Sequence, residues 1–253
     1  MNQFKNLALL LIITIFLATP PAESQQNADV NEIVEKVDEL FRSKSSQGRV
    51  EMEIITPHWE RTLKMNIWTQ GMDKTFIRIT EPPKEKGVAT LRIENEMWNY
   101  LPKTNKVIKV PPSMMMSSWM GSDFNNDDLV DEFSLLEDYS YKIINPDDAE
   151  PGFIYVKCVP KQGLPIVWGK VVFAVREEDY IPVIEKYYDE KGKLMRVMHF
   201  KEIKTFDNRT IPSVMELIPQ NEEGKTVLRY LDLKFNINVD EDIFSLRNLR
   251  AGM

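Results

Sequence analysis

The feature that most constrains this chain is a period-two alternation of apolar and polar residues, which begins at residue 48 and recurs almost to the C-terminus. The stretches RVEMEII and ERTLKMNIW show it first, and similar stretches follow, separated mostly by short turn-like sequences. Successive side chains of a strand point to opposite faces, so the pattern predicts strands with one apolar face. We therefore predict a mainly β protein: a single curled antiparallel sheet, an incomplete β-barrel, of about 11 strands.

The alternation also predicts which face of one early strand is buried. Leu63, Met65 and Ile67 share a face, and polar or charged side chains alternate with them. We expect these three residues to line the concave side, because Lys64 would lose its hydration there without compensation. Trp68 then lies on the opposite, convex face.

One amphipathic helix is predicted before the first strand, in the stretch DVNEIVEKVDELFRSK. Val30, Ile33, Val34 and Val37 recur at helical spacing, with charged residues on the other side. Asp29 is a candidate N-cap. The apolar stripe of such a helix has to pack on another element, and the curled sheet is the available partner.

The N-terminus has the pattern of a secretory signal peptide. A single lysine precedes an apolar run over residues 7–18, and small residues follow it. At about twelve residues this run is shorter than the ~20 of a membrane-spanning helix. We predict a signal peptide over residues 1–24, cleaved near Ser24, followed by one domain over residues 25–253; the alternative is an uncleaved membrane anchor. No cysteine lies near the cleavage site to carry a lipid.

Charge and cysteine content exclude several classes of protein. The net charge is −7, which disfavours nucleic acid and anionic membrane surfaces as partners. Cys158 is the one cysteine, so no disulfide can form within the chain. It alternates with apolar residues of an expected strand, where a small buried side chain explains it better than a reactive thiol.

No motif for catalysis or metal binding is recognisable. His58 and His199 lack metal-ligand spacing, and no serine stands in a nucleophile-elbow context, so we expect neither an enzyme nor a cofactor or metal. An acidic run beginning at Asp123 resembles a calcium loop, but Asp128 stands where glycine is required and Ser134 where glutamate is required. We expect this run to cap a short helix over residues 129–136 instead.

Residues 113–129, SMMMSSWMGSDFNNDDL, form the most unusual stretch of the sequence. Methionine is adaptable and common where a surface has to repack around variable apolar partners. We predict a short helical lid at the mouth of an apolar cavity, with Gly121 as its hinge. The alternative is that the same residues simply fill a core. The candidate ligand-contacting residues are Leu63, Met65, Ile67, Met114, Met115, Met116, Trp119, Met120 and Phe124.

Taken together, these stretches resemble the LolA/LolB-like superfamily, in its branch of outer-membrane lipoprotein-sorting proteins. The resemblance covers essentially the whole mature chain, from the helix before GRVEME to DEDIFSLRNL, and SSWMGSDF is its most specific part. It implies an incomplete barrel whose apolar cavity accepts lipid or lipoprotein acyl chains in the periplasm. It also implies exchange with a lipid-exporting transporter of the inner membrane. At the position of an arginine that ties the lid to the barrel in the family, this chain has Gly71.

The leading hypothesis from the sequence is a monomeric periplasmic carrier that passes acyl chains between envelope membranes. The rival hypothesis is a sensor or interaction module that uses the same half-barrel to bind a partner protein. A continuous apolar lining favours the carrier, whereas a polar lining favours the module.

Overall fold

The computed structural model describes residues 22–129, 134–164 and 166–251. Most of the predicted signal peptide therefore lies outside the described residues. The strands are β1 (Ser45–Ile55), β2 (Glu60–Gln70), β3 (Lys74–Glu81), β4 (Ala89–Ile93), β5 (Glu96–Leu101), β6 (Lys106–Val110), β7 (Tyr139–Ile144), β8 (Phe153–Pro160), β9 (Lys170–Arg176), β10 (Pro182–Tyr188), β11 (Leu194–Phe206), β12 (Arg209–Pro219) and β13 (Lys225–Phe235). The helices are α1 (Ala22–Glu39), α2 (Leu135–Asp138) and α3 (Leu246–Arg250), with short 3₁₀ turns η1 (Pro102–Thr104), η2 (Pro112–Met114), η3 (Asp127–Leu129) and η4 (Glu241–Phe244).

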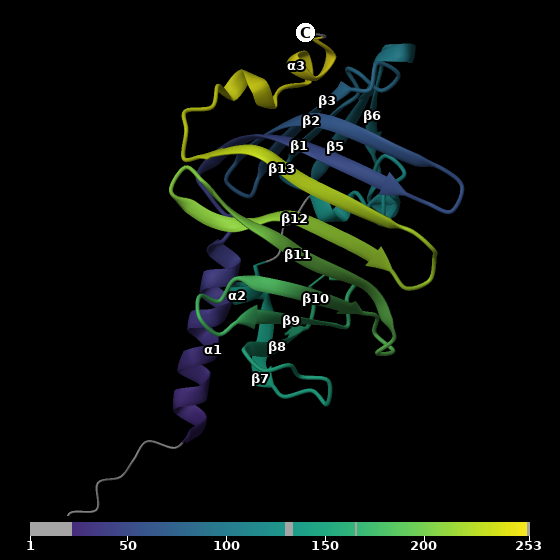
Figure 1. The fold of residues 1–253 in the computed structure, drawn as a ribbon. Helices are drawn as coiled ribbons and strands as arrows, with labels where there is room; N and C mark the ends of the chain where they lie inside the picture. Colours follow the sequence, from purple (N-terminus) through teal and green to yellow (C-terminus); the bar gives the residue numbers. More distant parts are fainter. Residues whose placement is uncertain (1–21, 130–133, 165, 252–253) are drawn as a thin grey trace, which may run out of the picture.

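The thirteen strands form one antiparallel sheet that is not closed into a barrel, so the predicted fold class is confirmed. Their order is β6-β5-β4-β3-β2-β1-β13-β12-β11-β10-β9-β8-β7. Strands that follow one another in the sequence are neighbours, except that β1 pairs with β13 and β6 and β7 are the two edges (Figure 1). The β1–β13 pairing joins the two halves of the chain into one curved surface.

The alternation in β2 places its side chains as predicted. Leu63 and Met65 are fully buried in one apolar cluster, and Ile67 packs against that cluster. Lys64 points to the other face and pairs with Glu81 at 2.9 Å. Directly paired residues on neighbouring strands share a face of a sheet, so β2 fixes which residues of the other strands line the concave side.

The C-terminal end of the chain packs on the convex face of the sheet. Trp68 and Phe76 lie on this face, their rings 5.7 Å apart, and Phe244 and Leu249 pack in the same cluster. Arg78 donates hydrogen bonds to the carbonyls of residues 248 and 251, at the C-terminal end of α3. A cation at that end of a helix meets carbonyl groups that lack a partner within the helix.

The helix α1 covers the part of the concave face that β7–β9 form (Figure 1). Val30, Ile33 and Val34 are buried against Cys158 and Phe173. The predicted helix and its apolar stripe are therefore present. The predicted N-cap at Asp29 is wrong, because α1 begins at Ala22.

Half of the predicted helix over residues 129–136 falls on residues that the structure does not describe. The structure has η3 at its start and the four-residue α2 at its end, and residues 130–133 lie outside the described part. Ser134 is the N-cap of α2, since its hydroxyl accepts a hydrogen bond from the Glu137 amide.

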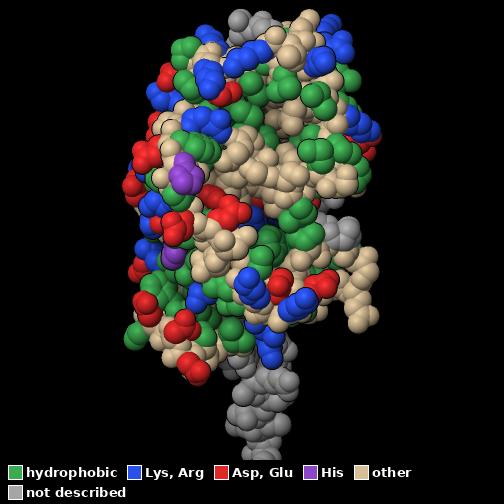
Figure 2. Space-filling model, turned by 90° about the vertical axis from the view of Figure 1, so that its right-hand side faces the viewer, with side chains coloured by type: hydrophobic (Ala, Val, Ile, Leu, Met, Phe, Trp, Pro, Cys, Tyr) green, Lys and Arg blue, Asp and Glu red, His purple; other side chains and the backbone are tan. Residues whose placement is uncertain are grey.

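None of the helices in the described part of the chain is long and apolar enough to span a membrane. Figure 2 looks onto the end of the sheet that bears the β1–β2 and β12–β13 turns, where hydrophobic and charged side chains are interspersed.

Burial of Cys158 gives a first testable prediction. The side chain is fully buried, and desolvation raises the pKa of its thiol to about 12. Because the thiolate is the reactive form, we expect the folded protein to resist Ellman's reagent at pH 8 and to react in urea. Absorbance at 412 nm measures both rates. Comparable rates with and without urea would contradict the buried position.

Candidate functional site

Residues 113–129, which we call the covering segment, cross the concave face without forming a regular helix. A Ser118–Asn125 bridge closes a hairpin-like loop between η2 and η3. The Asn126 side-chain amide donates to the carbonyls of Met114 and Ser117. Asparagine and serine compete with helical hydrogen bonds in this way, so the predicted helical lid is instead an irregular cover.

The structure brings most of the predicted site residues together. Trp119 and Phe124 of the covering segment are buried on Leu63 and Met65, and Met120 and Ile67 each pack against this cluster. Met115 packs in a separate cluster. Met114 and Met116 are 50% and 44% exposed, outside the apolar cluster. Six of the nine predicted residues therefore form one apolar contact: Leu63, Met65, Ile67, Trp119, Met120 and Phe124.

The apolar floor extends beyond the buried cluster under the covering segment. Phe200, Met215 and Leu228 pair directly across β11, β12 and β13, and all three are only half-buried. Tyr230 continues the same face, and Phe41 lies against its ring with 6.1 Å between centroids. These floor residues were absent from the sequence prediction. The period-two alternation in these strands was the signal that could have found them.

Polar contacts hold the middle of the covering segment to three strands. The Trp119 indole donates to the Thr90 hydroxyl at 3.1 Å. The Asp123 amide donates to the Thr226 hydroxyl, which in turn donates to the Asp123 carboxylate at 2.7 Å. Arg61 of β2 donates to the carbonyl of Met120. Because these contacts are few and lie at separate points, the segment is fixed mainly by its buried aromatic residues.

The contact from Arg61 is relevant to Gly71, which stands where the family has an arginine that ties the lid to the barrel. Gly71 lies in the β2–β3 turn with a φ of 56°, and its amide donates to the Lys44 carbonyl at 2.9 Å. An arginine of β2 nevertheless reaches the covering segment, from position 61 instead. Gly121 has a φ of 74°, and a β-carbon there would lie 3.3 Å from the Arg61 guanidinium. Glycine therefore permits both the turn and the close approach of Arg61.

A buried ion pair fixes the C-terminal end of the covering segment. Arg196 of β11 donates two hydrogen bonds to Asp128, at 2.5 and 2.7 Å. Its guanidinium lies over the rings of both Trp168 and Tyr187, 4.6 and 4.4 Å from their centroids, and these rings also contact each other. Burial also raises the pKa of the neighbouring Asp127. The ion pair lies between the cluster under the covering segment and the cluster under α1, because Tyr187 packs against both.

The acidic run was predicted to cap a helix over residues 129–136, half of which lies outside the described residues. At the start of η3, the Asn125 side chain accepts a hydrogen bond from the Asp128 amide, and the Asp128 carboxylate accepts one from the Asn125 amide. Asp123 is half-buried and bonded to Thr226, and burial raises the pKa of its carboxyl. Asn125 and Asn126 are buried. The acidic run therefore bonds both to strands of the sheet and to the backbone of its own loop. Among the described residues, no group of three histidine, cysteine or acidic side chains is placed to hold a metal ion.

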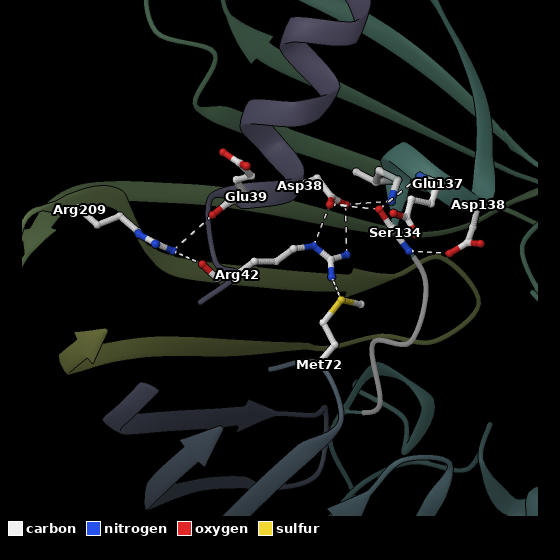
Figure 3. Close-up of polar contacts among 9 residues, drawn as sticks. Asp38, Glu39, Arg42, Met72, Ser134, Glu137, Asp138 and Arg209 are labelled. Atoms are coloured by element: carbon white, nitrogen blue, oxygen red, sulfur yellow. Dashed lines mark hydrogen bonds and ion pairs between the residues drawn. The ribbon is translucent and has the colours of Figure 1, made fainter. Parts of the chain in front are cut away.

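The hollows of about 750 and 450 Å³ beside the C-terminal end of α1 are lined mostly by charged and polar side chains. Figure 3 shows the contacts between them. Asp38 accepts hydrogen bonds from Arg42, from the Ser134 hydroxyl and from the Leu135 amide. Arg209 donates to three backbone carbonyls at the end of α1. This polar junction anchors α1 to α2 and β12, and its lining does not suit an apolar ligand.

Replacing Asp128 with asparagine tests how the covering segment is held. Removing one partner of a buried ion pair leaves the other charge uncompensated, at a cost of about 3–5 kcal/mol. Opening of the segment relieves that cost, so we expect proteolytic cleavage within residues 113–129 to become about a hundredfold faster. Limited proteolysis with mass spectrometry measures the rate. Asp127→Asn is the matched control, and equal rates in the two variants would contradict this role of the ion pair.

Three solved structures are similar to this chain, each at 20% sequence identity. A DUF1329 family protein from Desulfovibrio piger has a TM-score of 0.78 and matches 88% of this chain and 99% of its own. An outer membrane lipoprotein-sorting protein domain from Vibrio parahaemolyticus has a TM-score of 0.74, with 90% and 99% covered. LolA superfamily protein NE2245 from Nitrosomonas europaea has a TM-score of 0.71, with 86% and 97% covered. These matches show a shared fold.

No curated protein matches the sequence. A family model described as "-like: Uncharacterized protein" matches residues 71–251, which is well over half of the chain. The predicted resemblance to the LolA/LolB-like superfamily is confirmed in the fold. The chain therefore belongs to the family that this model describes, and its fold is that of the LolA superfamily and of lipoprotein-sorting domains.

Proposed function

We propose that this protein is a carrier that binds lipid or lipoprotein acyl chains on the concave face of its sheet. The observation that carries the proposal is the apolar floor of β11–β13, half-buried and continuous with the cluster under the covering segment. The segment above that cluster is irregular and rich in methionine, a side chain that repacks easily around apolar ligands. An acyl chain would lie along the floor and displace the nearer part of the segment.

The free energy of such binding comes from removing the acyl chain from water. Each buried methylene contributes ~0.8 kcal/mol, so a long chain contributes on the order of 10 kcal/mol before ordering costs are subtracted. Opening the covering segment takes up part of this energy. A cover that packs moderately on the floor permits both uptake and release, whereas a rigid core would permit neither.

The sequence supports the remaining parts of the proposal. A signal peptide over residues 1–24 would deliver one domain, residues 25–253, to the periplasm as a soluble monomer. The cargo would pass between envelope membranes or to and from a transporter of the inner membrane. The rival function, a module that grips a partner protein, is less well supported, because the floor is apolar over three neighbouring strands.

Leu228→Gln tests the proposal on the floor itself. A bound acyl chain would desolvate the amide, which costs about 1–3 kcal/mol, so we expect palmitate affinity to fall by about ten- to a hundredfold. Titration calorimetry with palmitate measures the affinity. Leu231→Gln is the matched control, because Leu231 belongs to the same strand and is 46% exposed.

Two outcomes would contradict the proposal. One is wild-type protein that binds no palmitate, with no lipid in organic extracts of protein purified from its native envelope. The other is an equal loss of affinity in the Leu228 and Leu231 variants, which would place the acyl chain away from the concave floor.

A further inference from the structure

Three turns at one end of the sheet form an exposed surface that the carrier function does not explain. They connect β1 to β2, β3 to β4, and β5 to β6. We call this surface the rim, and its exposed residues include Trp59, Pro83, Lys84, Lys86, Lys103 and Lys106. Figure 2 looks onto this end, and Lys and Arg side chains prevail over its upper part, where β2–β6 lie.

The parts of the rim are joined by direct contacts. Arg61 lies against the Trp59 ring, 5.2 Å from its centroid, and pairs with Glu85 of the β3–β4 turn at 3.6 Å. In the same turn, a β-carbon on Gly87 would lie 3.6 Å from the Pro102 ring, next to Lys103. The rim is therefore one continuous surface that joins the three turns.

The rim carries positive charge on a chain whose net charge is −7. Its four lysines form no ion pair with any described residue, whereas the neighbouring acids Glu81 and Glu85 are paired with Lys64 and Arg61. Glu60 is the acidic exception beside Trp59. The β12–β13 turn on the other side of Trp59 bears Glu222 and Glu223, so the positive charge is confined to the side of β3–β6.

A large aromatic ring stands at the edge of this basic surface. Trp59 is 44% exposed, although it is the largest apolar side chain of the three turns. Tryptophan favours the interface between lipid headgroups and acyl chains, where its ring is buried and its N–H stays hydrated. Lysines around such a ring gain from the negative surface potential of anionic lipids. The combination of an exposed tryptophan and unpaired lysines fits an anionic lipid surface.

We infer that the rim docks the protein on a bilayer that contains anionic lipids, with Trp59 in the interface and the four lysines against the headgroups. This inference rests on the proposed carrier function, because a lipid carrier has to contact a membrane. It specifies which surface of the protein makes that contact and that the lipids are anionic. The same contact would bring the covering segment to the bilayer, because Arg61 beneath Trp59 holds the carbonyl of Met120.

The first test is co-sedimentation of the mature protein with vesicles of phosphatidylcholine alone and of phosphatidylcholine mixed with phosphatidylglycerol. We expect binding to the anionic vesicles only, weakened by salt. The triple variant Lys84→Gln, Lys86→Gln, Lys103→Gln should lower the partition coefficient about a hundredfold, since each basic residue near an anionic surface contributes about fivefold. The control triple variant replaces Lys142, Lys191 and Lys234, which are also exposed, and should bind like the wild type.

The second test follows Trp59 directly. Binding to anionic vesicles should shift the tryptophan emission to shorter wavelength, and Trp59→Phe should remove most of that shift while circular dichroism stays unchanged. Equal binding to neutral vesicles, no binding at all, or equal effects of the two triple variants would each overturn the inference. An unshifted emission spectrum in the wild type would overturn it as well.

Palmitate affinity separates this inference from the proposed function. The triple variant at Lys84, Lys86 and Lys103 should bind palmitate as the wild type does, because these residues lie outside the floor. Palmitate binding without vesicle binding would overturn the rim contact and leave the carrier function standing. Vesicle binding through the rim without palmitate binding would overturn the carrier function and leave the rim contact standing.

Discussion

An open sheet of thirteen strands has a concave apolar face that must be shielded from water, and the rest of this structure depends on that burial. Two covers of different chemistry provide it. The helix α1 buries Val30, Ile33 and Val34 on the strands around Phe173. The covering segment buries Trp119 and Phe124 over β1–β3. A regular helix with β-branched residues makes a stiff cover, whereas an irregular loop with methionines makes an adaptable one.

A line of polar contacts separates the two covers. Arg196 and Asp128 lie between them on the sheet, and Asp38 joins α1 to α2 at the edge of the same face. Both contacts join residues that are far apart in the sequence, so each depends on how the whole sheet curves. Under the proposed function, the covering segment would move while α1 stays in place. The floor of Phe200, Met215 and Leu228 lies where such a movement would admit an acyl chain.

The periodic parts of the fold were predictable, because they follow from local alternation. Leu63, Met65 and Ile67 face the concave side, and Lys64 lies outside in its pair with Glu81, as the pattern in one strand indicated. The apolar stripe of α1 was predictable for the same reason.

What the sequence could not reveal depends on residues brought together by the register of distant strands. The contact between Arg61 and Met120 spans 59 positions, and the ion pair of Arg196 with Asp128 spans 68. The predicted helical lid failed because asparagine side chains bond to the loop backbone, a competition that composition alone does not decide. The bond of Asp123 to Thr226 was hidden for a related reason, because Thr226 lies on the last strand.

The central claim is that the covering segment opens while the sheet stays folded. Amide hydrogen exchange tests it most directly, with the amides of Trp119 and Asn126 as reporters in the segment and those of β1 and β2 as reporters in the sheet. We predict a lower opening free energy for the segment than for the sheet, and a change in its exchange when palmitate binds. Identical opening free energies in both regions, unaffected by palmitate, would show that the segment is part of one rigid core and would contradict the account.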